Sequence, residues 1–289
     1  MDVSGIVVVN KHAGVTSNDI VIKLRRLFGT RQVGHTGTLD PMATGVLPVL
    51  IGRAVKASEN ITAENKRYTA HLKLGITTDT EDTTGTVLSK TEHIPSDGDV
   101  LHVCSTFVGE ILQTPPMYSA LKVNGRKLVD LAREGIVVER QARPITIHSL
   151  HATQLEEDLY ELDVCCSKGT YIRTLCADIG GALGCGGVMA TLRRTMAAGY
   201  TLEEAVTIDE VQEKGEAVLR QVDTLFRQYD EYHITHPRVE FLCRNGNPFI
   251  VHEALEEGLY RVYGMDGMFL CLSRLEGGQM TSVKNFFGA

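Results

Sequence analysis

The chain has 289 residues, of which 43% are hydrophobic and 22% are charged, and its formal net charge is -7 at pH 7. This length is enough for one large domain and one small domain, and the composition is ordinary for a globular protein. No apolar run approaches the ~20 residues of a membrane-spanning helix. The sequence therefore excludes a helical membrane protein.

The N-terminus and the cysteines indicate a cytoplasmic protein. Residues 1–5 include no basic residue, and the apolar run Ile6–Val9 is too short for a signal peptide. Seven scattered cysteines form no CxxC pair, which predicts reduced, mostly buried thiols. Two His-x-x-His pairs, His148/His151 and His233/His236, would point to opposite faces of a strand. We therefore predict no metal site.

The first predicted elements are a strand over residues 5–9 and a helix over 18–28. Apolar residues at i, i+3 and i+4 spacing predict the helix, with Ser17 as its N-cap. Gly29 follows the last apolar position and is predicted to end the helix.

The middle of the chain mixes strand and helix signals. Alternation predicts a strand over 67–74 with Tyr68 on the apolar face, and the Asp/Thr-rich stretch 77–86 predicts a loop. Further strands are predicted over 145–150 and 159–166. Further helices are predicted over 98–107, 127–134, 171–183 and 208–226. Because these elements lack a regular βαβ rhythm, the predicted fold is α+β.

The pattern of apolar residues and glycines changes after Phe226. Short strands separated by glycines are predicted over 238–243, 258–263, 268–273 and 279–284, a pattern typical of a small all-β module. We therefore predict two domains, a larger one over 1–229 and a small β-rich one over 230–289.

The acidic total conceals a segregation of charge. Residues 1–60, 115–145 and 167–200 each carry a net charge of +3, whereas the acidic excess lies in the segments between and after them. RNA affinity depends on neutralising phosphates, and the local field governs binding more than the net charge does. The sequence is therefore compatible with RNA binding in a positive cleft, provided that the basic segments converge.

The segment Gly34–Val49, GHTGTLDPMATGVLPV, has the densest group of unusual residues. Its glycines permit positive φ or close backbone approach, and Pro41 restricts Asp40 to extended backbone. This indicates a rigid loop that presents the Asp40 carboxylate and the His35 imidazole. The residues alone leave open that Asp40 only caps a turn.

A second acidic motif, Asp82-Thr83-Thr84-Gly85, is interpreted as a surface turn. It departs from an aspartic-protease signature by an inserted residue, and the chain has no second copy to form a carboxylate dyad. No GxxxxGK[ST] phosphate loop occurs either.

Five blocks resemble, in order, the motifs of the TruB family of pseudouridine synthases, which act on uridine 55 in the T-loop of tRNA. The blocks are Gly34–Val49, Lys66–Thr80, Gln113–Gly135, Ser167–Arg173 and Thr191–Arg194. The resemblance covers about residues 5–205. The tail is similar in length and texture to the PUA-type RNA-binding module of this family. Two departures, His12 in place of proline and Leu128 in place of an aromatic, leave the acidic, tyrosine and arginine positions intact.

The resemblance implies a stand-alone isomerase with a mixed, largely antiparallel central sheet flanked by helices. Asp40 is the implied nucleophile, and Arg173 is the guanidinium that keeps it charged. Tyr68 is implied to stack on the target uracil and to assist removal of the C5 proton. The residues alone leave open that Tyr68 is a core aromatic on an alternating strand, and that Arg173 is a structural ion pair or a phosphate contact.

Since a uridine in a folded tRNA arm is inaccessible, the resemblance also implies base flipping. His35 is implied to fill the vacated space, and Tyr171 and Leu192 to line the base pocket, although both fit plain core packing. Basic residues that the resemblance suggests as RNA-backbone contacts, each otherwise a solvated charge, are Lys11, Lys122, Arg126, Lys127, Arg193 and Arg194.

Because the isomerisation is redox-neutral, no cofactor is predicted. The predicted partner is the T-arm of tRNA, bound by a monomer without guide RNA or membrane. The alternatives are a guide-RNA-dependent pseudouridine synthase and a tRNA-binding or tRNA-folding protein with secondary catalysis. The sequence does not decide whether Asp40 attacks C1′ or C6, or acts through a glycal.

Overall fold

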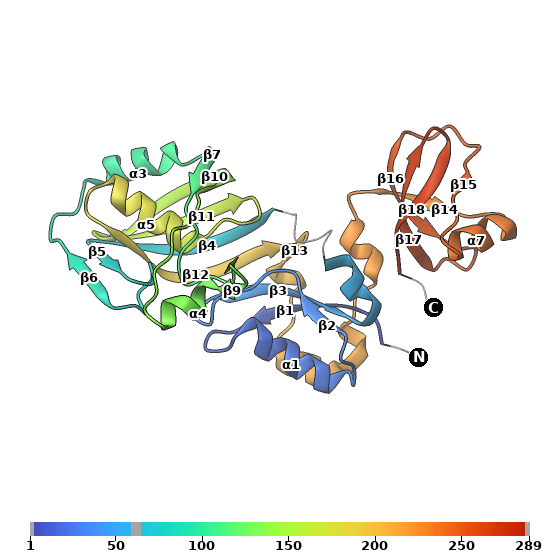
Figure 1. Ribbon diagram of the computed structural model, residues 1–289, viewed down its shortest axis with the longest axis horizontal. Helices are drawn as coiled ribbons and strands as arrows, with labels where there is room; N and C mark the ends of the chain where they lie inside the picture. Colours follow the sequence, from blue (N-terminus) through green and yellow to red (C-terminus); the bar gives the residue numbers. More distant parts are fainter. Residues whose placement is uncertain (1–2, 59–64, 287–289) are drawn as a thin grey trace.

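The computed structural model describes residues 3–58 and 65–286 (Figure 1). In these residues a nine-stranded sheet has the order β1-β3-β12-β4-β11-β10-β7, with β2 paired to β3 and β13 paired to β12. The strands are β1 (Gly5–Lys11), β2 (Val33–His35), β3 (Thr44–Ile51), β4 (Lys66–Leu74), β7 (Gly109–Gln113), β10 (Arg143–Glu156), β11 (Leu159–Cys166), β12 (Gly187–Ala197) and β13 (Tyr200–Thr201). The β3–β12 pair is parallel, and the other pairs described in this sheet are antiparallel. The predicted α+β fold with a mixed, largely antiparallel sheet is confirmed.

Four helices pack with the sheet into the main hydrophobic core. They are α1 (Ser17–Leu27), α3 (Asp97–Thr106), α5 (Ile172–Ala182) and α6 (Ile208–Lys214). Strand β4 alternates as predicted, since Tyr68, Ala70, Leu72 and Leu74 are buried whereas the residues between them are partly exposed. Within the described residues, no helix combines the length and apolarity needed to cross a membrane.

Helix α1 begins one residue earlier than predicted. Thr16, not Ser17, is the N-cap: its side chain accepts from the Asp19 backbone N–H, and the Asp19 carboxylate accepts from the Thr16 backbone N–H. Ser17 is instead buried, and its hydroxyl bonds to both backbone groups of Leu39. The residue predicted to cap the helix therefore ties it to the Gly34–Val49 segment.

Shorter elements refine two other predictions. The predicted loop 77–86 starts inside a hairpin of β5 (Ile76–Thr78) and β6 (Val87–Lys90). The helix predicted over 208–226 is broken into α6 (Ile208–Lys214), η3 (Gly215–Val218) and η4 (Val222–Phe226), because Gly215 adopts φ 56°. The remaining short elements of this part are η1 (Gly52–Ala57), β8 (Lys122–Val123), β9 (Arg126–Lys127), α4 (Leu128–Arg133) and η2 (Leu202–Glu204).

The C-terminal residues form a second sheet, coloured orange to red in Figure 1. Its order is β14-β16-β17-β18-β15, from β14 (Asp230–His233), β15 (Phe249–Ile250), β16 (Gly258–Tyr263), β17 (Phe269–Glu276) and β18 (Gln279–Asn285). The strand predicted over 238–243 is wrong, because helix α7 (Pro237–Arg244) occupies it. Pro237 stands in the first turn, and the His236 side chain caps the helix by accepting from the Arg238 N–H.

Aromatic and hydrogen-bond contacts join η4 to the C-terminal sheet. The Phe226 ring lies 6.1 Å from Phe269 and 5.6 Å from Phe286, centroid to centroid, and the Tyr263 hydroxyl donates to Asp223 at 2.8 Å. These contacts pack the C-terminal sheet against η4.

The parallel contact between β3 and β12 explains Gly45. Gly45 pairs with Arg194 and adopts φ 103°, and a Cβ there would lie 2.2 Å from the Arg194 carbonyl oxygen. Glycine alone permits both this conformation and this approach.

Gly45→Ala is therefore expected to lower the free energy of unfolding by about 3 kcal/mol or more, because strain and overlap with backbone add. Gly29→Ala is the matched control. Gly29 also has positive φ (61°), but a Cβ there meets nothing within 4 Å, so its cost should stay at about 1–2 kcal/mol. Urea unfolding measures both, and equal losses would contradict the role given to crowding at Gly45.

Candidate active site

Asp40 lies in the loop between β2 and β3, the segment singled out by sequence. Its carboxylate Oδ2 forms an ion pair with Arg173, at 3.0 Å from Nε. The Asp40 side chain is 35% exposed and the Arg173 side chain is 7% exposed, so the carboxylate is reachable from solvent while its partner is not. The predicted Asp40–Arg173 pair is therefore present, as a reachable carboxylate on a buried guanidinium.

Arg173 is held by three further groups. Nη1 donates to the Thr80 carbonyl at 3.2 Å, and Nη2 donates to the Tyr118 carbonyl at 2.8 Å. Asp82 Oδ2 lies 3.7 Å from Nη1. Since these partners fix the plane of the guanidinium, the fold itself sets the position of the positive charge beside Asp40.

Asp82 corrects the interpretation of residues 82–85 as a surface turn. It is buried, and its Oδ1 accepts from Thr80 Oγ1 at 2.8 Å and from the Thr84 N–H at 2.9 Å. The sequence carries little signal of this, because one buried aspartate within a run of Asp, Thr and Gly has the same pattern as an exposed turn. Asp82 therefore belongs to the site as the second carboxylate beside Arg173.

Side chains from three other elements hold the backbone around Asp40. Ser17 on α1 bonds the Leu39 N–H at 2.8 Å and the Leu39 carbonyl at 3.1 Å. Lys11 Nζ donates to the Pro41 carbonyl at 3.3 Å, and Arg194 donates to the carbonyls of Gly37 and Thr38. Backbone groups on both sides of Asp40 are thus hydrogen-bonded. The loop is therefore held in place, as its composition predicted.

Two predicted RNA contacts are corrected by this arrangement. Lys11 and Arg194 are 0% and 1% exposed. The Lys11 ammonium donates hydrogen bonds to the carbonyls of His12, Val15 and Pro41. Charges buried this way cannot reach a phosphate, so both residues serve the loop rather than the RNA backbone.

Burial lowers the pKa of Lys11 from 10.5 to about 8, against the opposing charge of Asp40 and with a further lowering by Arg194. Between those values the unfolded chain binds more protons than the folded one. The free energy of unfolding should therefore rise with pH over this interval.

The expected result is that wild type gains stability relative to Lys11→Met as pH rises from about 8 to 10.5, since the variant lacks the titrating group. Urea unfolding of both proteins at several pH values across this window measures the difference. A difference that stays constant or shrinks over the window would contradict the buried, pKa-lowered Lys11.

The predicted base-pocket residues lie on different elements. Tyr68 on β4 and Leu192 on β12 are 7% and 8% exposed. Tyr171 is half-buried at the start of α5, where Gln113 accepts from its N–H at 2.8 Å and donates to its carbonyl at 3.1 Å. Gln113 lies in a recognised block, but its bonding role was not visible in sequence. The roles of Tyr68, Tyr171 and Leu192 toward a base remain predictions.

His35 is partly buried at the end of β2. Burial lowers the pKa of His35, and the charge of Arg194 lowers it further, so the ring is neutral near pH 7. Its Nδ1 is buried without a hydrogen-bond partner among the described residues.

The other predicted RNA contacts are exposed. Lys122 on β8 and Lys127 on β9 face each other across the hairpin, and Arg193 follows Leu192 on β12. Arg126 is also exposed but forms an ion pair with Glu134. Like charges directly opposite each other destabilise a bare hairpin, so the Lys122–Lys127 pair favours an anionic partner at this surface.

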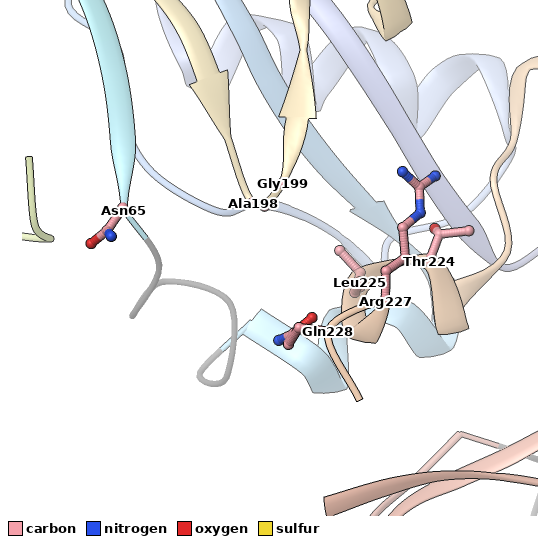
Figure 2. A pocket seen from close by; sticks show the side chains of 7 residues that line it. All are labelled: Asn65, Ala198, Gly199, Thr224, Leu225, Arg227 and Gln228. Carbon is pink, nitrogen blue, oxygen red and sulfur yellow. The ribbon is translucent and has the colours of Figure 1, made fainter. Parts of the chain in front are cut away.

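A cavity of about 480 Å³ lies beside the β12–β13 turn (Figure 2). It is lined by Asn65, Ala198, Gly199, Thr224, Leu225, Arg227 and Gln228. None of these is a predicted site residue, and Arg227 is paired with Glu204 at 3.3 Å. The cavity is therefore separate from the Asp40–Arg173 site. Among the described residues, no group of three or more His, Cys, Asp or Glu is placed to hold a metal ion.

Comparisons with known proteins identify two family models along the chain. Residues 25–172 match the model described as TruB family pseudouridylate synthase (N terminal domain). Residues 173–227 match the tRNA pseudouridylate synthase B C-terminal domain. The junction of the models separates Arg173 on α5 from Asp40 in the loop between β2 and β3, although the two residues form one ion pair.

Individual relatives align over nearly their whole length. The tRNA pseudouridine synthase B of Clostridium perfringens (strain 13 / Type A) is 43% identical over 94% of this chain and 95% of its own. That of Dechloromonas aromatica is 45% identical over 90% of this chain and 88% of its own.

One solved structure with the same fold is a chain of an H/ACA RNP bound to a substrate RNA containing 2′-deoxyuridine. The TM-score is 0.73, at 21% identity over 98% of this chain and 85% of that chain. At this identity the likeness concerns the fold.

Proposed function

Because the chain belongs to the TruB family of pseudouridylate synthases, we propose that it isomerises a uridine of tRNA to pseudouridine, acting alone on the T-loop uridine at position 55. The observation that carries the proposal is the Asp40–Arg173 pair, in which a partly exposed carboxylate rests at 3.0 Å on a buried, immobilised guanidinium. That arrangement presents a carboxylate nucleophile to solvent beside a fixed positive charge.

The proposed reaction breaks the C1′–N1 bond of the uridine, turns the uracil and forms a C1′–C5 bond, while the C5 proton is replaced by one on N1. Asp40 acts as the nucleophile that holds the detached sugar or base during the turn. Tyr68, buried beside the loop, stacks on the uracil and assists removal of the C5 proton.

Access requires the uridine to leave its stack. In this proposal the neutral His35 ring fills the vacated space, and Tyr171 and Leu192 line the pocket that receives the base. Lys122, Arg126, Lys127 and Arg193 hold the RNA backbone without reading sequence.

The same proposal divides the chain into a catalytic domain over 1–229 and a PUA-like RNA-binding domain over 230–289. The separate sheet order of β14–β18 and the aromatic seam at Phe226 support this division. We further propose that the protein works as a monomer without guide RNA.

The test is incubation of an unmodified tRNA transcript with the pure protein, without guide RNA or added cofactor. Release of tritium from [5-³H]uridine and mapping of pseudouridine give the rate and the position. A transcript with cytidine in place of the T-loop uridine is the control. Product confined to the T-loop uridine is expected. The absence of product refutes the activity, and product elsewhere refutes the position.

A further inference from the structure

We propose that Arg194 is a positioning residue of the active site, a buried fork that fixes the Asp40 loop against Tyr68. The positioning role is inferred from the geometry of the site. The expected effect on turnover rests on the proposed function.

The guanidinium of Arg194 bonds the two sides of the Asp40 loop together. Nη2 donates to the Gly37 carbonyl at 3.0 Å and Nη1 to the Thr38 carbonyl at 3.5 Å, before Asp40 in the chain. Nε donates to the Val46 carbonyl at 2.7 Å, after it. One side chain therefore sets the spacing between the entry and the exit of the loop.

Strand register places Arg194 directly against Tyr68. The two residues are Cα partners in the antiparallel β12–β4 pair, so their side chains stand on the same face. Burial raises the pKa of Tyr68, and the charge and hydrogen bond of Arg194 oppose that rise. The Arg194 side chain therefore contacts both the Asp40 loop and Tyr68, and holds them at a fixed distance from each other.

Arg194 carries a positive charge that its neighbours solvate rather than neutralise. It is 1% exposed, and in residues 3–58 and 65–286 no carboxylate lies within the 4.0 Å of an ion pair with it. Burying a charge is costly unless hydrogen bonds replace water. The carbonyls of Gly37, Thr38 and Val46 supply that replacement, which they can do only while the loop keeps this shape.

A lysine cannot substitute for this fork. A single ammonium lacks the planar spread of donors that reaches carbonyls on both sides of the loop. Arg194→Lys keeps the charge and removes the geometry, so it separates a positioning role from a simple electrostatic one. Arg193→Gln, its exposed neighbour on β12, is the comparison for loss of an RNA contact.

The experiment measures tRNA affinity and single-turnover rate for wild type, Arg194→Lys and Arg193→Gln, with amide hydrogen exchange in the free proteins. For Arg194→Lys we expect a rate about 100-fold lower with tRNA affinity within about threefold of wild type. Exchange at Leu39 and Ala43, whose N–H groups are bonded in the loop, should quicken, while the protected amides of β11 stay unchanged. Arg193→Gln should instead weaken tRNA binding and reduce its salt dependence.

Two outcomes overturn the proposal. Wild-type turnover in Arg194→Lys would show that the fork is dispensable. Weakened binding with an unchanged rate would make Arg194 an RNA contact. If the wild-type protein itself forms no pseudouridine, the proposed function fails, and the exchange of Leu39 and Ala43 alone then decides: unchanged exchange refutes the positioning role. Loss of protection throughout β11 would mark global unfolding, and Arg194→Gln with the same readouts then replaces Arg194→Lys.

Discussion

Asp40→Asn is expected to abolish pseudouridine formation, with a fall in the single-turnover rate of about 10⁴-fold or more. The amide is nearly isosteric with the carboxylate but has no charge with which to attack carbon. Binding of tRNA should persist, because the exposed basic residues of the proposed RNA surface are untouched. Filter binding and tritium release measure the two quantities separately.

Asp163→Asn is the matched control for this substitution. Asp163 also forms an ion pair with an arginine Nε, that of Arg67, at 2.9 Å, but both side chains of this pair are exposed. We expect wild-type turnover from that variant. Substantial pseudouridine formation by Asp40→Asn would remove Asp40 from the role of nucleophile.

Arg173→Lys is the second substitution with a large expected effect. Turnover should fall by about 10³-fold, because lysine offers a point charge where the site uses one donor for Asp40 and others for Thr80 and Tyr118. Affinity for tRNA should change little, since the guanidinium is buried. Single-turnover kinetics at saturating enzyme separate the two effects.

The comparison for Arg173→Lys is Arg67→Lys, which alters the exposed Arg67–Asp163 pair by the same chemistry. Exposed pairs contribute at most about 1 kcal/mol, so Arg67→Lys should keep nearly full activity. If Arg173→Lys weakens tRNA binding in proportion to its loss of rate, Arg173 is an RNA contact and the assigned ion pair is incidental.

Periodicity was sufficient to predict the elements that carry strong apolar patterns. Strands β4 and β11 and helices α1, α3 and α5 lie within a residue or two of their predicted bounds. Helix α7 was predicted as a strand because its eight residues are too few to establish a helical period. The informative signal was Pro237, which cannot donate a ladder hydrogen bond but fits the first turn of a helix.

Local sequence motifs likewise predicted only part of the site, because some of its contacts join residues far apart in the chain. Asp40 and Arg173 stand in recognisable motifs, and their pairing follows from the family resemblance. Lys11 and Arg194 were predicted on the surface because a basic residue is seldom buried. The carbonyls that make burial possible come from residues as far as 157 positions away, and no local pattern records such a partner.

The order of strands has a consequence for how the protein is made. Strand β12 lies between β3 and β4 in the sheet, yet it follows them by more than a hundred residues in the chain. A ribosome that has not yet released residue 187 therefore leaves two apolar strands with open edges, a state that slows folding and invites aggregation. Because β12 also delivers Arg194, the loop that presents Asp40 takes its final shape only when the sheet closes. The ability to act on RNA is thus acquired late in biogenesis, with the closing strand.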